Sequence, residues 1–142
     1  MNTMKATDVR RDWSKIIDSV IREKPAFIRR TRDDLFLSNI AILHSILEAY
    51  EFNASKYIED DGSVTLSLDA IDLVENASTE GEAILKLAES ILEYANDYYD
   101  NFDYWNRGNR KSHVPYVIRA LILNDSQKIG GLLKCHPGKT EN

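Results

Sequence analysis

The feature that most constrains the fold is a change of apolar periodicity at Lys24-Pro25. Before this point apolar residues recur at helical spacing: Val9, Trp13, Ile16, Ile17, Val20 and Ile21. The spacing predicts one amphipathic helix that starts at Asp8, with Thr7 as its N-cap and a short strand at residues 3–5 before it. The helix ends near Lys24 because proline disfavours helical geometry in the preceding residue.

After the proline, short apolar runs at residues 26–31 and 35–38 predict a β-hairpin with its turn at Arg32-Asp33-Asp34. Ser38 is placed to cap a second helix that reaches about Tyr50. The helical pattern stops at Asn53-Ala54-Ser55, which predicts a joint there. The expected domains are therefore residues 1–54 and residues 55–142.

The second segment mixes strands and helices. Residues 57–59 and 63–68 flank Asp60-Asp61-Gly62, and Asp-Gly predicts a tight hairpin. A third strand is expected at residues 71–74, and Thr79 and Glu82 have the capping-box spacing of a long helix. Two further helices are expected from Val114 and Ser126, and residues 137–142 as a frayed tail. The predicted class is α+β: a strand-helix-hairpin-helix module, a small strand-strand-helix unit and C-terminal helices.

Charge is divided unevenly along the chain. Residues 1–32 hold nine Lys or Arg against four acids, although the whole chain has a net charge of -5. A basic end suits a polyanion, which the acidic remainder would repel. Six basic residues of the predicted helix and hairpin are the candidate nucleic-acid contacts: Arg10, Arg11, Lys15, Arg29, Arg30 and Arg32.

Three features that the sequence lacks bear on the expected location and cofactors: a membrane-spanning run, a signal peptide and a set of metal-binding cysteines. No apolar run approaches the roughly 20 residues that span a bilayer, and the charged first residues do not form a signal peptide. We therefore expect a cytoplasmic protein without a membrane partner. The lone Cys135 allows no intrachain disulfide and falls short of a zinc site.

A resemblance to a known family rests on Ala6-Thr7, Arg10, Trp13-Ser14 and Pro25-Ala26-Phe27-Ile28 followed by Arg29-Arg30. In this order and spacing they resemble the N-terminal domain of the Phd/YefM antitoxins. The resemblance implies a dimer with both hairpins in a shared sheet, repression of the protein's own operon, and neutralisation of a toxin by the C-terminal part. It also implies that Arg10 and Arg30 contact DNA. Asp33 and Asp34 depart from the family's turn, and they would repel phosphates if they pointed toward DNA.

A second resemblance lies in the middle of the chain. The Asp-Asp-Gly hairpin, the alternating Val64, Leu66 and Leu68, and the helix start at residues 79–83 are similar to the HicB-like antitoxin domain. This resemblance implies a strand-strand-helix fold and an interaction role.

Enzyme chemistry is not expected. Glu59, Asp60 and Asp61 could suggest a metal site, but adjacent residues on a strand point in different directions, and Asp-Gly already explains the turn. We therefore expect no catalytic residue, metal or cofactor. A dense aromatic group, represented by Tyr98, Tyr99, Tyr104 and Trp105, predicts either a partner surface or packing beneath the last two helices.

The function these observations favour is that of a dimeric antitoxin that binds operator DNA, autorepresses its operon and binds a cognate toxin stoichiometrically. Arg10 and Arg30 are the expected principal DNA contacts, with Arg11, Lys15, Arg29 and Arg32 supplying sequence-independent attraction. Two alternatives stay open: a module that sequesters a protein partner without binding DNA, and a small metal-dependent nuclease. The expected partners are operator DNA, the toxin, and a second copy or higher oligomer.

Overall fold

The computed structural model describes residues 1–139 and separates into two compact units, of which unit 1 is Met1–Ile46 and unit 2 begins at Leu47. The sequence predicted the boundary near residue 54. Asn53 is instead the first residue of a strand in unit 2. Residues 140–142 of the expected tail lie outside the described residues.

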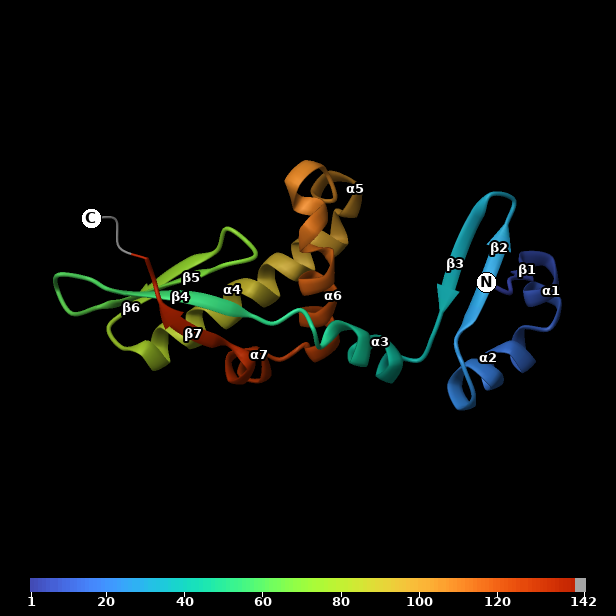
Figure 1. Cartoon of the computed structure of the whole chain (residues 1–142), viewed down its shortest axis with the longest axis horizontal. Coiled ribbons are helices and arrows are strands. Elements are labelled where there is room, and N and C mark those ends of the chain that lie inside the picture. The colour runs from blue at the N-terminus through green and yellow to red at the C-terminus, as the bar shows by residue number, and fades with distance from the viewer. Residues whose placement is uncertain (140–142) are drawn as a thin grey trace. The chain divides into compact units, whose positions relative to one another are not determined.

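Unit 1 is a three-stranded sheet with helices against one face (Figure 1). In chain order it contains β1 (Met4–Lys5), α1 (Ala6–Arg11), α2 (Trp13–Arg22), β2 (Ala26–Arg30), β3 (Asp33–Leu37) and α3 (Ile40–Leu47), whose last residue belongs to unit 2. The strand order is β1-β2-β3, with β1 parallel and β3 antiparallel to β2. Four buried residues form the core: Val9, Val20, Ala26 and Ile28.

The helices of unit 1 differ in detail from the expected single helix. Asp12 interrupts the helix between α1 and α2, although the apolar stripe continues across it. The first helix begins at Ala6 rather than Asp8, and Thr7 lies inside it. In α3 the cap is Asn39 rather than Ser38, because the Asn39 side-chain oxygen accepts the backbone N–H of Ile42 at 2.9 Å.

The hairpin turn is shorter than expected. It consists of Thr31 and Arg32, and Thr31 has a left-handed backbone with φ 57°. Asp33 and Asp34 therefore belong to β3, where they lie opposite Arg30 and Arg29. The prediction of a turn at Arg32-Asp33-Asp34 was wrong by two residues, because aspartates typical of turns can equally extend a strand when cations lie across from them.

Unit 2 is a four-stranded sheet with helices. In chain order it contains β4 (Asn53–Ile58), β5 (Val64–Leu68), β6 (Val74–Ala77), α4 (Glu80–Asp100), α5 (Phe102–Trp105), the 3-10 helix η1 (Gly108–His113), α6 (Val114–Leu123), α7 (Ser126–Leu132) and β7 (Lys134–Pro137). The strand order is β6-β5-β4-β7, in which β7 alone runs parallel to its neighbour. The last strand therefore pairs with the first.

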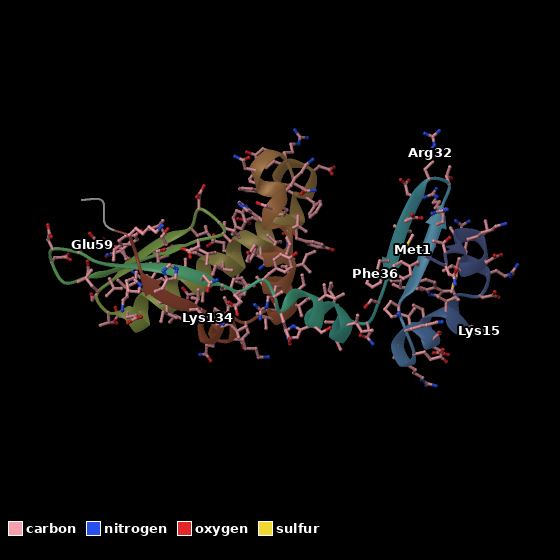
Figure 2. The ribbon with its side chains drawn as sticks, in the orientation of Figure 1. Met1, Lys15, Arg32, Phe36, Glu59 and Lys134 are labelled. Atoms are coloured by element: carbon pink, nitrogen blue, oxygen red, sulfur yellow. The ribbon has the colours of Figure 1, made fainter. Side chains whose placement is uncertain are left out.

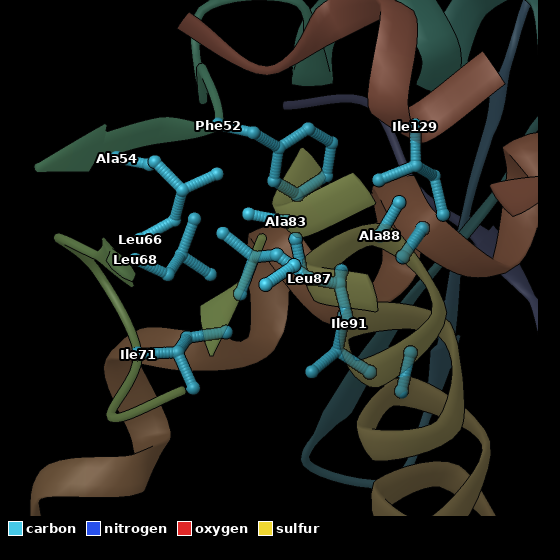
Figure 3. Packing of buried hydrophobic residues seen from close by; sticks show 14 of the residues in the cluster. Phe52, Ala54, Leu66, Leu68, Ile71, Ala83, Leu87, Ala88, Ile91 and Ile129 are labelled. Atoms are coloured by element: carbon cyan, nitrogen blue, oxygen red, sulfur yellow. The ribbon is translucent and has the colours of Figure 1, made fainter. Parts of the chain in front are cut away.

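The core of unit 2 lies between the sheet and α4. Alternate residues of β4 and β5, such as Ala54, Leu66 and Leu68, face Ala83, Leu87 and Ile91 of α4 (Figure 3). Phe52 and Ile129 close this core. Helices α6 and α7 also pack against α4. This arrangement makes α4 the central element of unit 2.

Several expectations for unit 2 are confirmed. The Thr79 hydroxyl accepts the backbone N–H of Glu82 at 3.2 Å and starts α4. Gly62 adopts φ 84° in the turn between β4 and β5, as the predicted Asp-Gly hairpin requires.

Two expectations for unit 2 differ from the structure. The third strand lies at Val74–Ala77 rather than at residues 71–74. The strand β7 was not expected, and Pro137, predicted to begin a frayed tail, is its last residue.

Candidate nucleic-acid interface

A groove on the helical side of unit 1 brings Arg10 and Arg30 together. Its volume is about 750 Å³, and it opens between α1 and the hairpin. The two arginines share it with mainly apolar residues: Ala6, Val9, Trp13, Ile28, Leu35, Phe36 and Leu37. The groove therefore combines two cations with an apolar lining.

Local structure explains why both arginines reach this groove. Val9 is buried, and the next residue along α1, Arg10, is exposed beside it. On β2, Ala26 and Ile28 point toward the helices, so the period of two places Arg30 on the same face. Arg30 remains exposed at the open end of that face.

The six basic candidates fall into two groups by their ion pairs. Within residues 1–139, no acidic side chain pairs with Arg10, Lys15, Arg30 or Arg32. Figure 2 shows Arg32 extending from the hairpin tip and Lys15 on the helical part of unit 1. Arg11, in contrast, lies 3.4 Å from Asp8 and 3.2 Å from Asp12. Arg29 is also paired, with Asp34.

Arg29 and Asp34 face each other across β2 and β3 on the sheet face opposite the helices. The Arg29 Nε donates to Asp34 Oδ1 at 2.8 Å, and Nη2 donates to Oδ2 at 3.2 Å. The hydrogen bond to Asp34 raises the pKa of Arg29. The same hydrogen bond lowers the pKa of Asp34. Arg29 therefore differs from Arg30, its neighbour, in both the face it occupies and its partner.

The groove contains a signal that the sequence reading missed. Trp13 was assigned to the buried stripe of the first helix, yet it is 51% exposed. Leu35 and Phe36 of β3 are also exposed, and β3 is an edge strand. The apolar stripe of the sequence has more residues than the small core of unit 1 buries, and this excess was the available signal for an exposed apolar surface.

The aromatic group divides between core and surface. Tyr98 is 0% exposed, and its hydroxyl donates to the backbone carbonyl of Arg110 at 2.7 Å. This burial excludes Tyr98 from a partner surface and is a correction to the expected site. Trp105 is half-buried against the core, whereas Tyr99 and Tyr104 are exposed. Packing therefore accounts for Tyr98 and Trp105, whereas Tyr99 and Tyr104 have exposed side chains.

The acidic turn of unit 2 is organised by local hydrogen bonds. The Asp61 carboxylate accepts the Ser63 backbone N–H at 2.9 Å and the Ser63 hydroxyl at 2.5 Å. Nowhere in residues 1–139 do three His, Cys, Asp or Glu side chains gather closely enough to hold a metal ion. In the same part of the chain, no helix has both the length and the apolar character needed to cross a bilayer.

Comparison with known proteins decides the family. The PHD-like family model, described as an antitoxin of a RelE/RelB toxin-antitoxin system, matches residues 1–135. The chain belongs to this antitoxin family. The antitoxin is also similar to a crystal structure from Syntrophomonas wolfei subsp. wolfei, described as the antitoxin part of a proposed toxin/antitoxin system. The two share 35% sequence identity with a TM-score of 0.90, over 96% of this chain and 99% of the other. Among curated proteins, none matches the antitoxin significantly.

Family membership confirms part of the expected function. The antitoxin belongs to a toxin-antitoxin system, which implies a cognate toxin as its partner. The mixed α+β class is confirmed as well.

Proposed function

We propose that the antitoxin binds operator DNA through unit 1, represses its own operon as a dimer, and neutralises the toxin by stoichiometric binding. The observation that carries the DNA-binding part is the shared groove of Arg10 and Arg30, which come from separate elements and have no acidic partner within residues 1–139. Arginine can donate paired hydrogen bonds to phosphate oxygens or to guanine O6 and N7. The strand-helix-hairpin-helix order of unit 1 supports the Phd/YefM-type assignment.

Dimerisation is supported by the edge of the unit 1 sheet. β3 is the last strand of the order β1-β2-β3, and its Leu35 and Phe36 are exposed. An exposed, apolar edge strand is a template for pairing with another chain. Two β3 strands paired about a twofold axis would join the two hairpins in one sheet and present two equivalent pairs of Arg10 and Arg30. Such symmetry suits the two half-sites of an operator.

Toxin binding is assigned to unit 2 on charge and exposed aromatic residues. Unit 1 holds nine of the 18 Lys and Arg and six of the 23 Asp and Glu, which leaves nine and 17 to the rest of the chain. A surface this acidic would be repelled by DNA and attracts a basic protein. Tyr99 and Tyr104 offer exposed aromatic anchors on it.

The test of DNA binding is the pair of variants Arg10→Ala and Arg30→Ala. Each is expected to weaken binding to the chain's own promoter fragment by about 1–3 kcal/mol, roughly five- to 150-fold, as for the loss of a bidentate base contact. Binding is measured by fluorescence anisotropy at fixed salt, because the electrostatic part of the affinity depends strongly on ionic strength.

Arg11→Ala is the matched control for Arg10→Ala. It removes the same charge from the next position of α1, but from an arginine already paired with Asp8 and Asp12. It is expected to change the affinity much less. Full affinity in the Arg10→Ala and Arg30→Ala double variant would remove both residues from the interface. A wild-type protein that binds its toxin but not its promoter would instead be a sequestering module.

A further inference from the structure

A carboxylate, Asp34, is paired with Arg29, one of the six basic candidates, on the sheet face opposite the groove of Arg10 and Arg30. Asp34 is on β3, directly across from Arg29 on β2, in the second cross-strand pair from the two-residue turn. The two side chains form two parallel hydrogen bonds, at 2.8 and 3.2 Å, with both guanidinium and carboxylate partly exposed. This is the bidentate geometry in which arginine binds a carboxylate most strongly.

The neighbouring carboxylate provides an internal comparison. Asp33 lies across from Arg30 in the same ladder, one residue closer to the turn. In the described part of the chain no ion pair joins these two side chains, so the Arg30 guanidinium keeps its donors. Two adjacent cross-strand pairs of the same residue types thus differ. Arg29 donates hydrogen bonds to Asp34, whereas Arg30 is not paired with Asp33 and can donate to another acceptor.

The ion pair of Arg29 and Asp34 affects the attraction of unit 1 to a polyanion more than it affects folding stability. Ion pairs this exposed contribute little to folding, because solvent screens them and holding both side chains in one geometry costs entropy. Their effect on a polyanion is larger. A guanidinium that already donates to a carboxylate offers fewer N–H groups to a phosphate, and the carboxylate cancels its charge locally.

We propose that Asp34 is a specificity-determining residue: by occupying Arg29 it withholds that arginine from phosphates, so that binding depends on Arg10 and Arg30. The proposal rests on the proposed DNA-binding function. It revises the expectation that Arg29 supplies sequence-independent attraction. Weakening attraction that every duplex shares raises the ratio of operator affinity to affinity for other DNA.

The experiment uses the full chain and two labelled duplexes, its own promoter fragment and an unrelated duplex of equal length and base composition. Asp34→Asn is expected to bind the unrelated duplex several-fold more tightly and the promoter fragment with a smaller gain. The slope of log affinity against log salt should steepen by about 0.9 for each Arg29 released onto a phosphate. Asp34→Ser, which also removes the carboxylate, should behave alike.

Asp33→Asn is the matched control, because it removes an equal charge one residue away from an arginine that is not paired with it. It should leave the salt slope unchanged. Equal effects of Asp33→Asn and Asp34→Asn would overturn the proposal, since net charge alone would then explain them. An undiminished effect of Asp34→Asn in an Arg29→Met background would also overturn it, because the carboxylate would then be acting without Arg29.

The failure of this inference differs from a failure of the proposed function. A wild-type protein that binds neither duplex contradicts DNA binding itself and the role of Asp34 with it. A wild-type protein that binds the promoter fragment, with Asp34→Asn indistinguishable from it on both duplexes, contradicts the role of Asp34 alone. Circular dichroism at the binding temperature checks that each variant is folded.

Discussion

Arg119 of α6 is a cation held inside unit 2, where it is 7% exposed. Its Nη1 donates to the backbone carbonyl of Tyr50 at 2.8 Å, and its guanidinium lies 5.4 Å from the centre of the Phe52 ring. Removing a cation from water is costly unless hydrogen bonds and a polarisable face replace the lost solvation. Arg119 therefore ties the segment before β4 to α6.

The variant Arg119→Met tests this tie. It keeps most of the aliphatic stem but leaves the Tyr50 carbonyl without its donor, so unit 2 should lose about 1–3 kcal/mol of unfolding free energy. Urea denaturation followed by circular dichroism measures the loss. Lys111→Met, which removes an exposed cation, is the control and should have little effect. An unchanged midpoint in Arg119→Met would show that water replaces the guanidinium at no cost.

β7 is held at the edge of the unit 2 sheet by its backbone and by polar side chains. The Gly138 N–H donates to the Lys56 carbonyl at 2.8 Å, just beyond the strand. His136 Nε2 donates to Asp69 Oδ2 at 2.7 Å, and Asp69 Oδ1 accepts the Ser55 hydroxyl at 2.7 Å. Only one side chain of the strand, Cys135, packs against the core. The polar contacts thus contribute much of what orders this strand.

The pairing of His136 with Asp69 predicts a pH dependence for β7. The hydrogen bond from His136 to Asp69 raises the pKa of His136. Burial opposes ionisation of Asp69, but hydrogen bonds from His136 and Ser55 outweigh it and lower the pKa of Asp69. The histidine contribution is complete below its unfolded pKa, near 6.5, and is lost as pH rises through the raised folded pKa. The aspartate contribution is lost as pH falls through its lowered pKa.

The measurement is the hydrogen-exchange protection of the Gly138 amide, corrected for the intrinsic rate at each pH. Protection should be greatest between the two folded pKa values and should fall as pH rises past that of His136. His136→Gln can retain a hydrogen bond but cannot titrate, so its protection should not change across that interval. A wild-type profile equal to that of His136→Gln would rule out the histidine as the cause.

Comparing α4 with β7 shows which parts of the fold could be predicted from the sequence. The start of α4 was predictable because the cap at Thr79 and the stripe through Leu87 and Ile91 are local signals. β7 was missed because Lys134–Pro137 has no apolar alternation, and its partner β4 lies some eighty residues earlier. Pairing between such distant segments gives no local signal in the sequence of either segment.

The candidate site could be predicted only in part, because some of its features depend on contacts between distant residues. Arg10 and Arg30 could be named from the family resemblance, and the structure places them in one groove. The pairing of Arg29 with Asp34 depends on the length of the turn, which fixes the hairpin register. The burial of Tyr98 depends on the return of the chain through η1, whose Arg110 carbonyl accepts its hydroxyl. Neither signal is local.

At the scale of the whole molecule, the two units are unequal in their cores. Unit 1 has four buried apolar residues in its cluster, whereas unit 2 has sixteen. A segment of 46 residues with so small a core is marginal by itself, and domains near this size commonly rely on association. In the proposed dimer, the exposed Trp13, Leu35 and Phe36 would supply the surface for such association.

The two tryptophans make this difference measurable, because Trp13 is in unit 1 and Trp105 in unit 2. In Trp105→Phe the fluorescence reports unit 1, and its thermal midpoint should rise with protein concentration, as mass action requires of a segment stabilised by association. In Trp13→Phe the remaining signal reports unit 2, and its midpoint should vary much less. Midpoints that are independent of concentration for both probes would argue against dimerisation through unit 1.

The parallel pairing of β7 with β4 also sets an order for folding during synthesis. Every strand of unit 1 has been translated by Leu37, so its sheet can form while later parts of the chain are still being made. β4 pairs with β7 on one side, so this pairing forms only after residues up to Pro137 have been made. A nascent chain therefore completes the portion proposed for DNA well before the portion proposed for the toxin.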